Sequence, residues 1–445
     1  MNKVLVLGAG RSSSALIEYL LHNSTRFDWR ITVADTDLIN AKSKTENHQN
    51  GIAVQFNIDD EENANKIVSE NDVVISLLPP HLHDKVAVHC IQHKKHLITA
   101  SYVSEKMKSL NREAIEKGIL IMCESGLDPG IDHMSAMQII DEIKAKDGKI
   151  ISFKSSCGGL VAPACDNNPW HYKISWNPRN VVLAGQATAQ YIDDGIKKFK
   201  PYHRLFAESE KLKIKGHGNF ESYPNRDSIS YISTYGLDGI KTLVRSTLRK
   251  ENYCSAWNAL IQLGLTDDSY KIHSNEKFTY QDWLMGFLLT SKKKESVSKT
   301  LSRTLGLKHH HRIIEQLLWL GIADKKKIGL GEFSPAQILQ QLIEEKWKMK
   351  KNDRDMVVMH HEFIYLNGKK KTKHTSSLII EGEKNHTAMA KTVGLPLGII
   401  CKLILQNKIS LTGVHIPIMK EVYEPALSEL RDHGIIFSDH FQVIN

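Results

Sequence analysis

Short apolar runs alternate with amphipathic stretches over about the first 130 residues. The runs show no strict alternation of apolar and polar side chains, and they comprise Val4–Leu7, Ile31–Ala34, Ile52–Phe56, Val73–Leu78, His96–Thr99 and Ile119–Cys123. Strands that are apolar on both faces are typical of a parallel sheet covered by helices on both sides. The pattern predicts an α/β fold with a Rossmann-type doubly wound parallel sheet over residues 1–130.

The pattern changes after Gly130. Residues 150–250 are mixed and rich in Gly, Pro, Asn and aromatic residues, with strands predicted at Ile150–Ser156 and Leu243–Leu248. Helical spacing then predicts an all-helical stretch made of Cys254–Leu265, Tyr280–Leu289, Ser296–Leu305, His310–Leu320 and Pro335–Trp347. A return to sheet is predicted where Met356–Leu366 and Ser376–Glu381 flank the turn signal Asn367-Gly368, and a helix over His386–Gln406 is expected to break at Gly394–Pro396.

The size of the chain, 445 residues, predicts two or three domains, each with its own core. Its 59 Lys and Arg exceed its 50 Asp and Glu by 9, a mild excess that suits anionic small ligands and is too diffuse to indicate nucleic acid. The lysine runs Lys292–Lys294, Lys346–Lys351 and Lys369–Lys373 are interpreted as solvated surface. Adjacent histidines at His309–His311 and His360–His361 point in different directions, so no metal site is predicted.

The six cysteines contain no C-x-x-C pair, and their spacing suits neither a disulfide framework nor a zinc site. We expect reduced thiols and a cytoplasmic location. The run Val4–Leu7 follows Met1–Lys3 directly, which leaves no room for a leader segment, and we find no apolar run close to the roughly 20 residues of a membrane span.

A glycine-rich loop follows the first predicted strand and opens a helix. Its residues are Gly8, Ala9, Gly10, Arg11 and Ser12, with Ser13 where the third glycine of G-x-G-x-x-G usually stands. Such glycines permit a tight turn and close approach of the backbone to a pyrophosphate at the helix N-terminus. Asp35 ends the second strand, where a carboxylate can accept bonds from both ribose hydroxyls, so NAD is predicted in preference to NADP. The alternative is an ordinary glycine turn with a helix-capping Asp35.

Three later loops should converge, because the carboxyl ends of parallel strands meet at one edge of the sheet. They begin at Ser76, Thr99 and Glu124, and they bring Ser101, Tyr102, Glu124 and Asp128 as hydroxyls and carboxylates for proton transfer. Ordinary turn chemistry explains the same residues equally well, since Asp-Pro-Gly is a favoured turn and Asp132 could cap the following helix.

The second region offers two further clusters. Cys157, Gly158 and Gly159 follow a predicted strand and indicate either close approach to a ligand or a plain glycine turn. The stretches Tyr223–Ser228 and Arg245–Arg249 supply guanidinium groups, which clamp carboxylates well. Taken alone, the residues favour structural ion pairs here.

Seven stretches, in order along nearly the whole chain, resemble saccharopine dehydrogenase of the glutamate-forming type, also called saccharopine reductase. They are Ala100–Ser104 (ASYVS), Gly126–Met134 (GLDPGIDHM), Ser155–Leu160 (SSCGGL), Lys173–Pro178 (KISWNP), Tyr223–Ser228 (YPNRDS), Val244–Arg249 (VRSTLR) and Thr387–Pro396 (TAMAKTVGLP). The resemblance implies oxidation of saccharopine with a nicotinamide cofactor and water to L-glutamate and 2-aminoadipate 6-semialdehyde, or the reverse reductive condensation. The alternatives are condensation of another amino acid or polyamine (carboxynorspermidine-type) and a non-catalytic dinucleotide-binding sensor.

The resemblance also implies the domains and the site. The expected domains are a dinucleotide-binding domain (1–130), a mixed α/β substrate and dimerisation domain (131–252 with 353–385), an all-helical insert (253–352) and a C-terminal segment (386–445) that returns to the first domain, in a homodimer. The implied substrate contacts are Ser101, Tyr102, Asp128, Arg226, Thr247, Leu248 and Arg249. The implied cofactor contacts are Gly8–Ser12, Asp35, Thr36, Leu77, Ser101, Leu127, Asp128, Pro129, Gly130, Ile131, Cys157, Gly158, Gly159 and Trp176.

Proton transfer is assigned to Tyr102, Asp128, Cys157 or bound water, without singling out one of them. Three positions depart from the family pattern. Ser156 stands where relatives commonly carry Tyr, Ser246 replaces a Gly, and Asp35 occupies a position where NADP-using relatives carry Arg. The first two departures affect the shape of the pocket, and the third bears on the cofactor.

Overall fold

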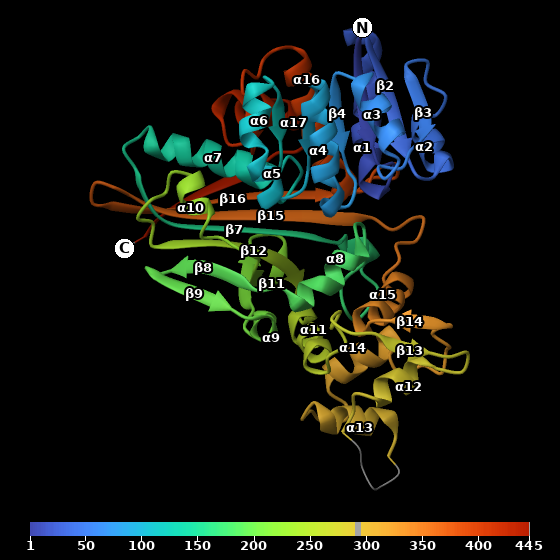
Figure 1. Cartoon of the computed structure of the whole chain (residues 1–445). Helices are drawn as coiled ribbons and strands as arrows, with labels where there is room; N and C mark the ends of the chain where they lie inside the picture. The colour runs from blue at the N-terminus through green and yellow to red at the C-terminus, as the bar shows by residue number, and fades with distance from the viewer. Residues whose placement is uncertain (290–294, 445) are drawn as a thin grey trace. The chain divides into compact units, whose positions relative to one another are not determined.

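The computed structural model describes residues 1–289 and 295–444 (Figure 1). The lysine run Lys292–Lys294, which is predicted to form solvated surface, lies outside the described residues. The chain forms two compact units. The first contains Met1–Lys149, Asn367–Lys370 and Ser376–His440, and the second contains Ile150–Leu366, Lys371–Thr375 and Phe441–Asn445.

The first unit contains a parallel sheet whose described strands have the order β17-β6-β5-β4-β1-β2-β3. The strands are β1 (Asn2–Leu7), β2 (Trp29–Asp35), β3 (Gly51–Gln55), β4 (Val73–Ser76), β5 (His96–Thr99), β6 (Leu120–Met122) and β17 (Gly413–His415). The predicted parallel sheet is confirmed, and all six predicted strands are present. The order reverses between β1 and β4, so the loops after these two strands lie at the switch point where such sheets bind ligands.

Helices cover this sheet and link its strands. They are α1 (Ser14–Phe27), α2 (Leu38–Thr45), α3 (Glu61–Ser69), α4 (His83–His93), α5 (Glu105–Ser109), α6 (Asn111–Glu116), α7 (Ile131–Lys144), α16 (Ala388–Leu405) and α17 (Lys420–Asp432). A short 3₁₀ turn, η1 (Arg11–Ser13), precedes α1.

The predicted break at Gly394–Pro396 is wrong, because α16 continues through Pro396 as one helix. The two glycines instead mark close packing. A Cβ atom at Gly394 would lie 2.8 Å from the backbone nitrogen of Leu16, and one at Gly398 would lie 2.5 Å from the Tyr19 ring. Among the described residues, α16 alone is long and apolar enough to cross a membrane, yet 78% of it is buried inside the protein, as in a core helix.

A mixed sheet has the order β10-β11-β12-β7-β15-β16-β18, with β8 and β9 joined beside β12, and most of its residues belong to the second unit, whereas residues 376–381 and 438–440 belong to the first. Its strands are β7 (Lys149–Val161), β8 (Ala189–Asp193), β9 (Ile196–Lys200), β10 (Glu210–Ile214), β11 (Gly218–Pro224), β12 (Thr242–Lys250), β15 (Asp355–Asn367), β16 (Lys370–Glu381) and β18 (Ser438–Ile444). The predicted strands at 150–156 and 243–248 are confirmed within β7 and β12. Asn367 is the last residue of β15, and Gly368 lies in the turn before β16.

Helices follow the sheet strands in the second unit. They are α8 (Pro178–Leu183), α9 (Tyr202–Leu205), α10 (Tyr231–Thr234), α11 (Tyr253–Gln262), α12 (Tyr280–Met285), α13 (Val297–Thr304), α14 (Arg312–Leu320) and α15 (Pro335–Lys346). The prediction of an all-helical stretch is incomplete, because β13 (Ile272–Ser274) and β14 (Gly331–Phe333) form a small antiparallel sheet inside it. The core of the second unit is rich in tryptophan and includes Trp170, Trp257, Trp283 and Trp347.

Candidate functional site

The glycine loop after β1 has the geometry of a phosphate-binding turn. Gly8 has a φ of 101°, and a Cβ atom there would lie 3.2 Å from the Leu77 carbonyl oxygen, so glycine is required. At Gly10, by contrast, φ is −71° and a Cβ atom would meet nothing within 4 Å. Gly10 therefore borders open space at the start of η1 and α1, where backbone N–H groups attract an anion.

Asp35 is bound to the backbone of two neighbouring turns. Its Oδ2 accepts a hydrogen bond from the Ala9 N–H at 2.6 Å, and its Oδ1 accepts one from the Asp37 N–H at 2.9 Å. Arg11, which follows the glycines of the loop, and Thr36, which follows Asp35, are both exposed. The carboxylate thus fixes the glycine loop and the start of the following turn, a role that resembles the structural alternative considered for the sequence.

A network of hydroxyl groups surrounds His83, which lies at the start of α4 and is only 3% exposed. Its Nδ1 lies 2.9 Å from Ser76 Oγ, and its Nε2 lies 2.8 Å from Ser101 Oγ and 3.1 Å from Thr99 Oγ1. Burial lowers the pKa of His83 from 6.5 to about 4, so the ring is neutral near pH 7. The prediction for Ser101 did not include His83, although its place after the strand that ends at Ser76 was a usable signal.

The loops after β5 and β6 bring the predicted hydroxyl and carboxylate together. The Tyr102 hydroxyl donates to Asp128 Oδ1 at 3.4 Å. Glu124 holds the same loop from behind, because its N–H donates to the Ser101 carbonyl at 3.0 Å and its Oε1 accepts from the Val103 N–H at 3.1 Å. Buried Glu124 Oε2 also lies 2.8 Å from His133 Nε2. Glu124 thus supports the Ser101–Val103 segment.

Residues 124–132 form a tightly folded loop. A Cβ atom at Gly130, whose φ is 147°, would lie 2.1 Å from the Gly126 carbonyl oxygen. Asp132 Oδ1 accepts from the Gly130 N–H at 2.6 Å, which stabilises the loop at the start of α7. Leu127, Pro129 and Ile131 are buried around the half-buried Asp128. The predicted cofactor contacts of this loop therefore include Asp128 as the side chain with the most solvent access.

In the second unit, strand register places several predicted residues on one face of the sheet. Thr247 is paired with Cys157 and with Tyr223, and Arg249 with Glu221. Because paired residues share a face and neighbours along a strand alternate, Thr247, Arg249 and Cys157 lie on one face. Leu248 points to the other face and is fully buried, so only its backbone remains for a ligand.

Arg249 is 3% exposed and enclosed by tyrosines. Its guanidinium carbon lies 5.1, 5.8 and 5.3 Å from the ring centres of Tyr172, Tyr223 and Tyr253. Nη1 donates to the Leu248 carbonyl at 2.8 Å, whereas Nε has no partner. In the described part of the chain, Arg249 forms no ion pair with a carboxylate. Burial alone would lower the pKa of the guanidinium, but the tyrosine oxygens outweigh it and raise that pKa.

The sequence missed Tyr172 and Tyr253. Tyr172 directly precedes the KISWNP stretch, and its hydroxyl also accepts a hydrogen bond from the half-buried Trp176 Nε1 at 3.0 Å. The signal was therefore present beside a recognised motif, but aromatic residues at this spacing are also common in cores. Trp176, predicted on the cofactor side, is connected through Tyr172 to Arg249.

Gly158 and Gly159 do not form a turn, which corrects that alternative, because β7 continues through both. A Cβ atom at Gly158 would lie 2.5 Å from the Leu248 carbonyl oxygen, so the close approach involves β12. The two serines that depart from the family pattern contact one another. Ser156 Oγ lies within hydrogen-bonding distance of Ser246 Oγ, at 2.7 Å, across the same pair of strands.

Arg226 lies in the loop after β11 with a φ of 54° and is exposed. The loop is fixed by the backbone, since the Gln190 N–H donates to the Arg226 carbonyl at 2.9 Å. Arg245, on β12, lies over the Tyr231 ring at 4.4 Å. The three arginines therefore differ in their surroundings: Arg226 is exposed, whereas Arg245 lies over one tyrosine ring and Arg249 over three.

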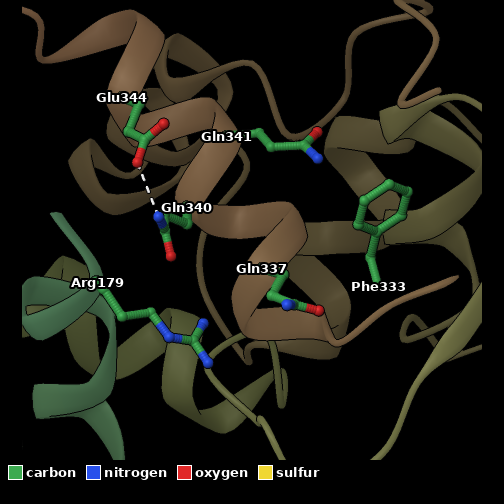
Figure 2. A pocket seen from close by; sticks show the side chains of 6 residues that line it. All are labelled: Arg179, Phe333, Gln337, Gln340, Gln341 and Glu344. Carbon is green, nitrogen blue, oxygen red and sulfur yellow. Dashed lines mark hydrogen bonds between the residues drawn. The ribbon is translucent and has the colours of Figure 1, made fainter. Parts of the chain in front are cut away.

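A cavity of about 360 Å³ lies elsewhere in the second unit, between α8 and α15 (Figure 2). Its lining differs from the predicted site and consists of Arg179, Phe333, Gln337, Gln340, Gln341 and Glu344. Arg179 is ion-paired with Asp268, and Gln340 Nε2 donates to Glu344 Oε1 at 2.8 Å. Among residues 1–289 and 295–444, no group of three or more His, Cys, Asp or Glu is placed to hold a metal ion.

Two family models match the chain. Residues 4–122 match the saccharopine dehydrogenase NADP binding domain, and residues 126–435 match the saccharopine dehydrogenase C-terminal domain. The saccharopine dehydrogenase [NADP(+), L-glutamate-forming] of Saccharomyces cerevisiae is 34% identical over 98% of each chain. The alpha-aminoadipic semialdehyde synthase of Arabidopsis thaliana is 35% identical over 97% of this chain, which spans only 44% of that longer protein.

Solved structures give the same result. Apo saccharopine dehydrogenase (L-Glu forming) from Saccharomyces cerevisiae superposes with a TM-score of 0.89 at 32% identity, covering 99% of this chain and 100% of that one. A homospermidine synthase from Legionella pneumophila has a TM-score of 0.55 at 9% identity over 99% of this chain and 91% of its own, which shows a shared fold alone.

The predicted preference for NAD over NADP is wrong. Relatives from Saccharomyces cerevisiae, Pyricularia oryzae and Schizosaccharomyces pombe, 33–34% identical over their whole length, are NADP(+) enzymes. The prediction rested on Asp35, whose two carboxylate oxygens each accept a backbone hydrogen bond, from the Ala9 and Asp37 N–H groups.

Proposed function

The chain belongs to the saccharopine dehydrogenase family, and on that premise we propose that it oxidises saccharopine with NADP and water to L-glutamate and 2-aminoadipate 6-semialdehyde, or catalyses the reverse condensation. The observation that carries the substrate assignment is Arg249, a buried cation enclosed by tyrosines and without a carboxylate partner in the described residues. Saccharopine has three carboxylates, and a guanidinium binds such a group with two parallel hydrogen bonds.

The first unit supplies the dinucleotide site in this proposal. Open space at Gly10 and the helix N-terminus behind it fit a pyrophosphate. The proposed contacts of this unit are Gly8–Ser12, Thr36, Leu77, Ser101 and Leu127–Ile131. Those of the second unit are Cys157–Gly159 and Trp176. When bound, the dinucleotide supplies the hydride acceptor for the carbon attached to the secondary amine of saccharopine.

The residues of this chain bind the substrate and move protons. The proposed carboxylate contacts are Arg249, Arg226 and Thr247, together with the backbone of Leu248. Ser101 is proposed to donate a hydrogen bond to the substrate. Tyr102 and Asp128 are proposed as a proton-transfer pair, because they already contact one another at 3.4 Å. Cys157 is the further candidate from the second unit. Water that adds to the oxidised C–N bond needs one such group to remove its proton.

Two wider expectations belong to the same proposal. We expect a homodimer, which light scattering at working concentration tests directly. We also expect a reducing, cytoplasmic compartment, because all six cysteines are free. A monomer, or a form joined by disulfides in the cell, would contradict these two expectations.

The test of function is a scan of purified protein with saccharopine and either NADP or NAD, followed by absorbance of the reduced cofactor. We expect steady NADPH formation with saccharopine and little with carboxynorspermidine-type amines. Turnover of a polyamine conjugate in place of saccharopine would establish the related condensation, and NADPH binding without turnover of either would establish a sensor.

A further inference from the structure

We infer that His83 is a positioning residue that hydrogen-bonds Ser76 through Nδ1 and Ser101 through Nε2, and so holds the Ser101 hydroxyl in one orientation toward a bound ligand. The inference rests on the proposed role of Ser101. It adds a residue that neither the sequence motifs nor the family relationship supplied.

The contacts are short and well defined. His83 Nδ1 lies 2.9 Å from Ser76 Oγ, and Nε2 lies 2.8 Å from Ser101 Oγ and 3.1 Å from Thr99 Oγ1. Ser76 and Thr99 are fully buried, and Ser101 is half-buried. Burial also lowers the pKa of His83 to about 4, which leaves the ring neutral with one donor nitrogen and one acceptor nitrogen.

The ring contacts both serines in either tautomer. With the hydrogen on Nε2, the ring donates to Ser101 Oγ and Thr99 Oγ1, and Ser76 donates to Nδ1. With the hydrogen on Nδ1, the ring donates to Ser76, and Nε2 accepts from a neighbouring hydroxyl, of which Ser101 Oγ is the nearer. The Nε2 atom is therefore the protein group that fixes the Ser101 hydroxyl.

Thr99 supports the same residue. Its Oγ1 lies 3.1 Å from His83 Nε2 and accepts from the Ser101 N–H at 3.3 Å, so the threonine fixes the backbone of Ser101.

The neighbouring loop makes Ser101 rigid. Its carbonyl accepts from the Glu124 N–H at 3.0 Å, and two residues later the Val103 N–H donates to Glu124 Oε1 at 3.1 Å. With the backbone held in this way, the orientation of the Ser101 hydroxyl depends chiefly on His83. A defined donor direction is what a ligand acceptor requires for a strong hydrogen bond.

Two amide substitutions separate the two sides of the ring. The terminal nitrogen of Gln reaches the position of Nε2, whereas that of Asn reaches only the position of Nδ1. We expect His83→Asn to lower kcat/KM for saccharopine by roughly tenfold, the value of one hydrogen bond, and His83→Gln to remain within about threefold of wild type. His81→Leu, an exposed neighbour, is the matched control and should leave kcat/KM unchanged.

A double-mutant cycle provides the readout that a purely structural role would not give. If His83 acts through Ser101, His83→Asn should cause no further loss in a Ser101→Ala background. The melting temperature of each variant is measured to establish that it is folded. Two results would overturn the inference: losses of kcat/KM that multiply in the double mutant, or a lower kcat/KM for His83→Gln than for His83→Asn. In either case the ring would act mainly through Ser76.

The same variants are titrated with NADPH by fluorescence. A wild type that binds NADPH but does not oxidise saccharopine would refute the proposed function and leave the cycle readable in the NADPH dissociation constant. In that case, additive losses of NADPH affinity would overturn the role of His83 as well. Non-additive losses would support it independently of the substrate.

Discussion

The hydroxyl network of the first unit and the tyrosine-enclosed arginine of the second unit solve different electrostatic problems. Around His83 each buried side chain has a hydrogen-bond partner, and burial keeps the histidine neutral. Around Arg249 a permanent cation is equally buried, but its neighbours are aromatic faces and one carbonyl, and Nε has no partner. The first region is complete in itself, whereas the second has the charge that an anionic substrate would complete.

The largest expected effect is that of Arg249→Met. Loss of a buried charge-assisted pair costs about 2 to 5 kcal/mol, so kcat/KM for saccharopine should fall at least thirtyfold while NADPH affinity stays unchanged. The free energy of unfolding should not fall, because an apolar side chain replaces a buried charge that lacks a carboxylate partner. Steady-state kinetics and urea unfolding measure the two effects.

Lys250→Met is the matched control, since it removes a cation from the adjacent position on β12, where Lys250 lies 4.3 Å from the Phe220 ring. It should leave saccharopine turnover unchanged. If Arg249→Met strongly destabilised the fold, the guanidinium would be a structural group, and the contrast between the two regions would be wrong.

The second prediction tests the neutral histidine. Because folding lowers the pKa of His83 from 6.5 to about 4, protonation favours the unfolded chain. The stability contributed by the neutral ring is complete above pH 6.5 and is lost as the pH falls toward 4. Between pH 7 and pH 5, wild type should lose about 2 kcal/mol of unfolding free energy relative to His83→Gln. Equal pH dependence of the two proteins in urea unfolding would show that His83 is not held neutral.

The two regions also differ in how far the sequence predicted them. In the first unit, the six apolar runs coincide with the strands β1 to β6. The rule that the carboxyl ends of parallel strands share an edge placed Ser101, Tyr102 and Asp128 in neighbouring loops. His83 was missed because, although it follows the strand that ends at Ser76, it lies on a helix seven residues later, and spacing alone does not show that the ring turns back toward the strand ends. The backbone partners of Asp35 were missed because they come from two separate turns.

In the second unit, the determining contacts depend on strand register. The pairing of Thr247 with Cys157 places Gly158 against Leu248, so this glycine serves packing between strands. Tyr172 and Tyr253 reach Arg249 from outside its strand. Local pattern cannot supply such contacts, because register is set by the packing of the whole sheet. The same limit explains Gly394, where close helix packing was interpreted as part of a helix break.

The third prediction compares two arginines of the second unit. Arg226 is exposed, so its interaction with a substrate carboxylate is weakened by water. We expect Arg226→Met to lower kcat/KM for saccharopine by about tenfold, less than Arg249→Met, with unchanged NADPH affinity. Unchanged kcat/KM would remove Arg226 from the substrate site. A loss larger than that of Arg249→Met would mean that burial does not decide the strength of the carboxylate contact.

The expected effect of Gly10→Ala is as small as that of Arg226→Met, and it is the most specific test of the first unit. Gly10 has a φ of −71° and a Cβ atom there meets no protein atom within 4 Å, so alanine introduces neither backbone strain nor a clash. The melting temperature should therefore stay unchanged. If the open space receives a pyrophosphate, the added methyl group should weaken NADPH binding by roughly tenfold, about 1.4 kcal/mol, in a fluorescence titration. Gly8→Ala is the informative comparison, because a φ of 101° and the Leu77 carbonyl at 3.2 Å predict a loss of stability as well. Full NADPH affinity in a stable Gly10→Ala protein would place the dinucleotide away from this loop.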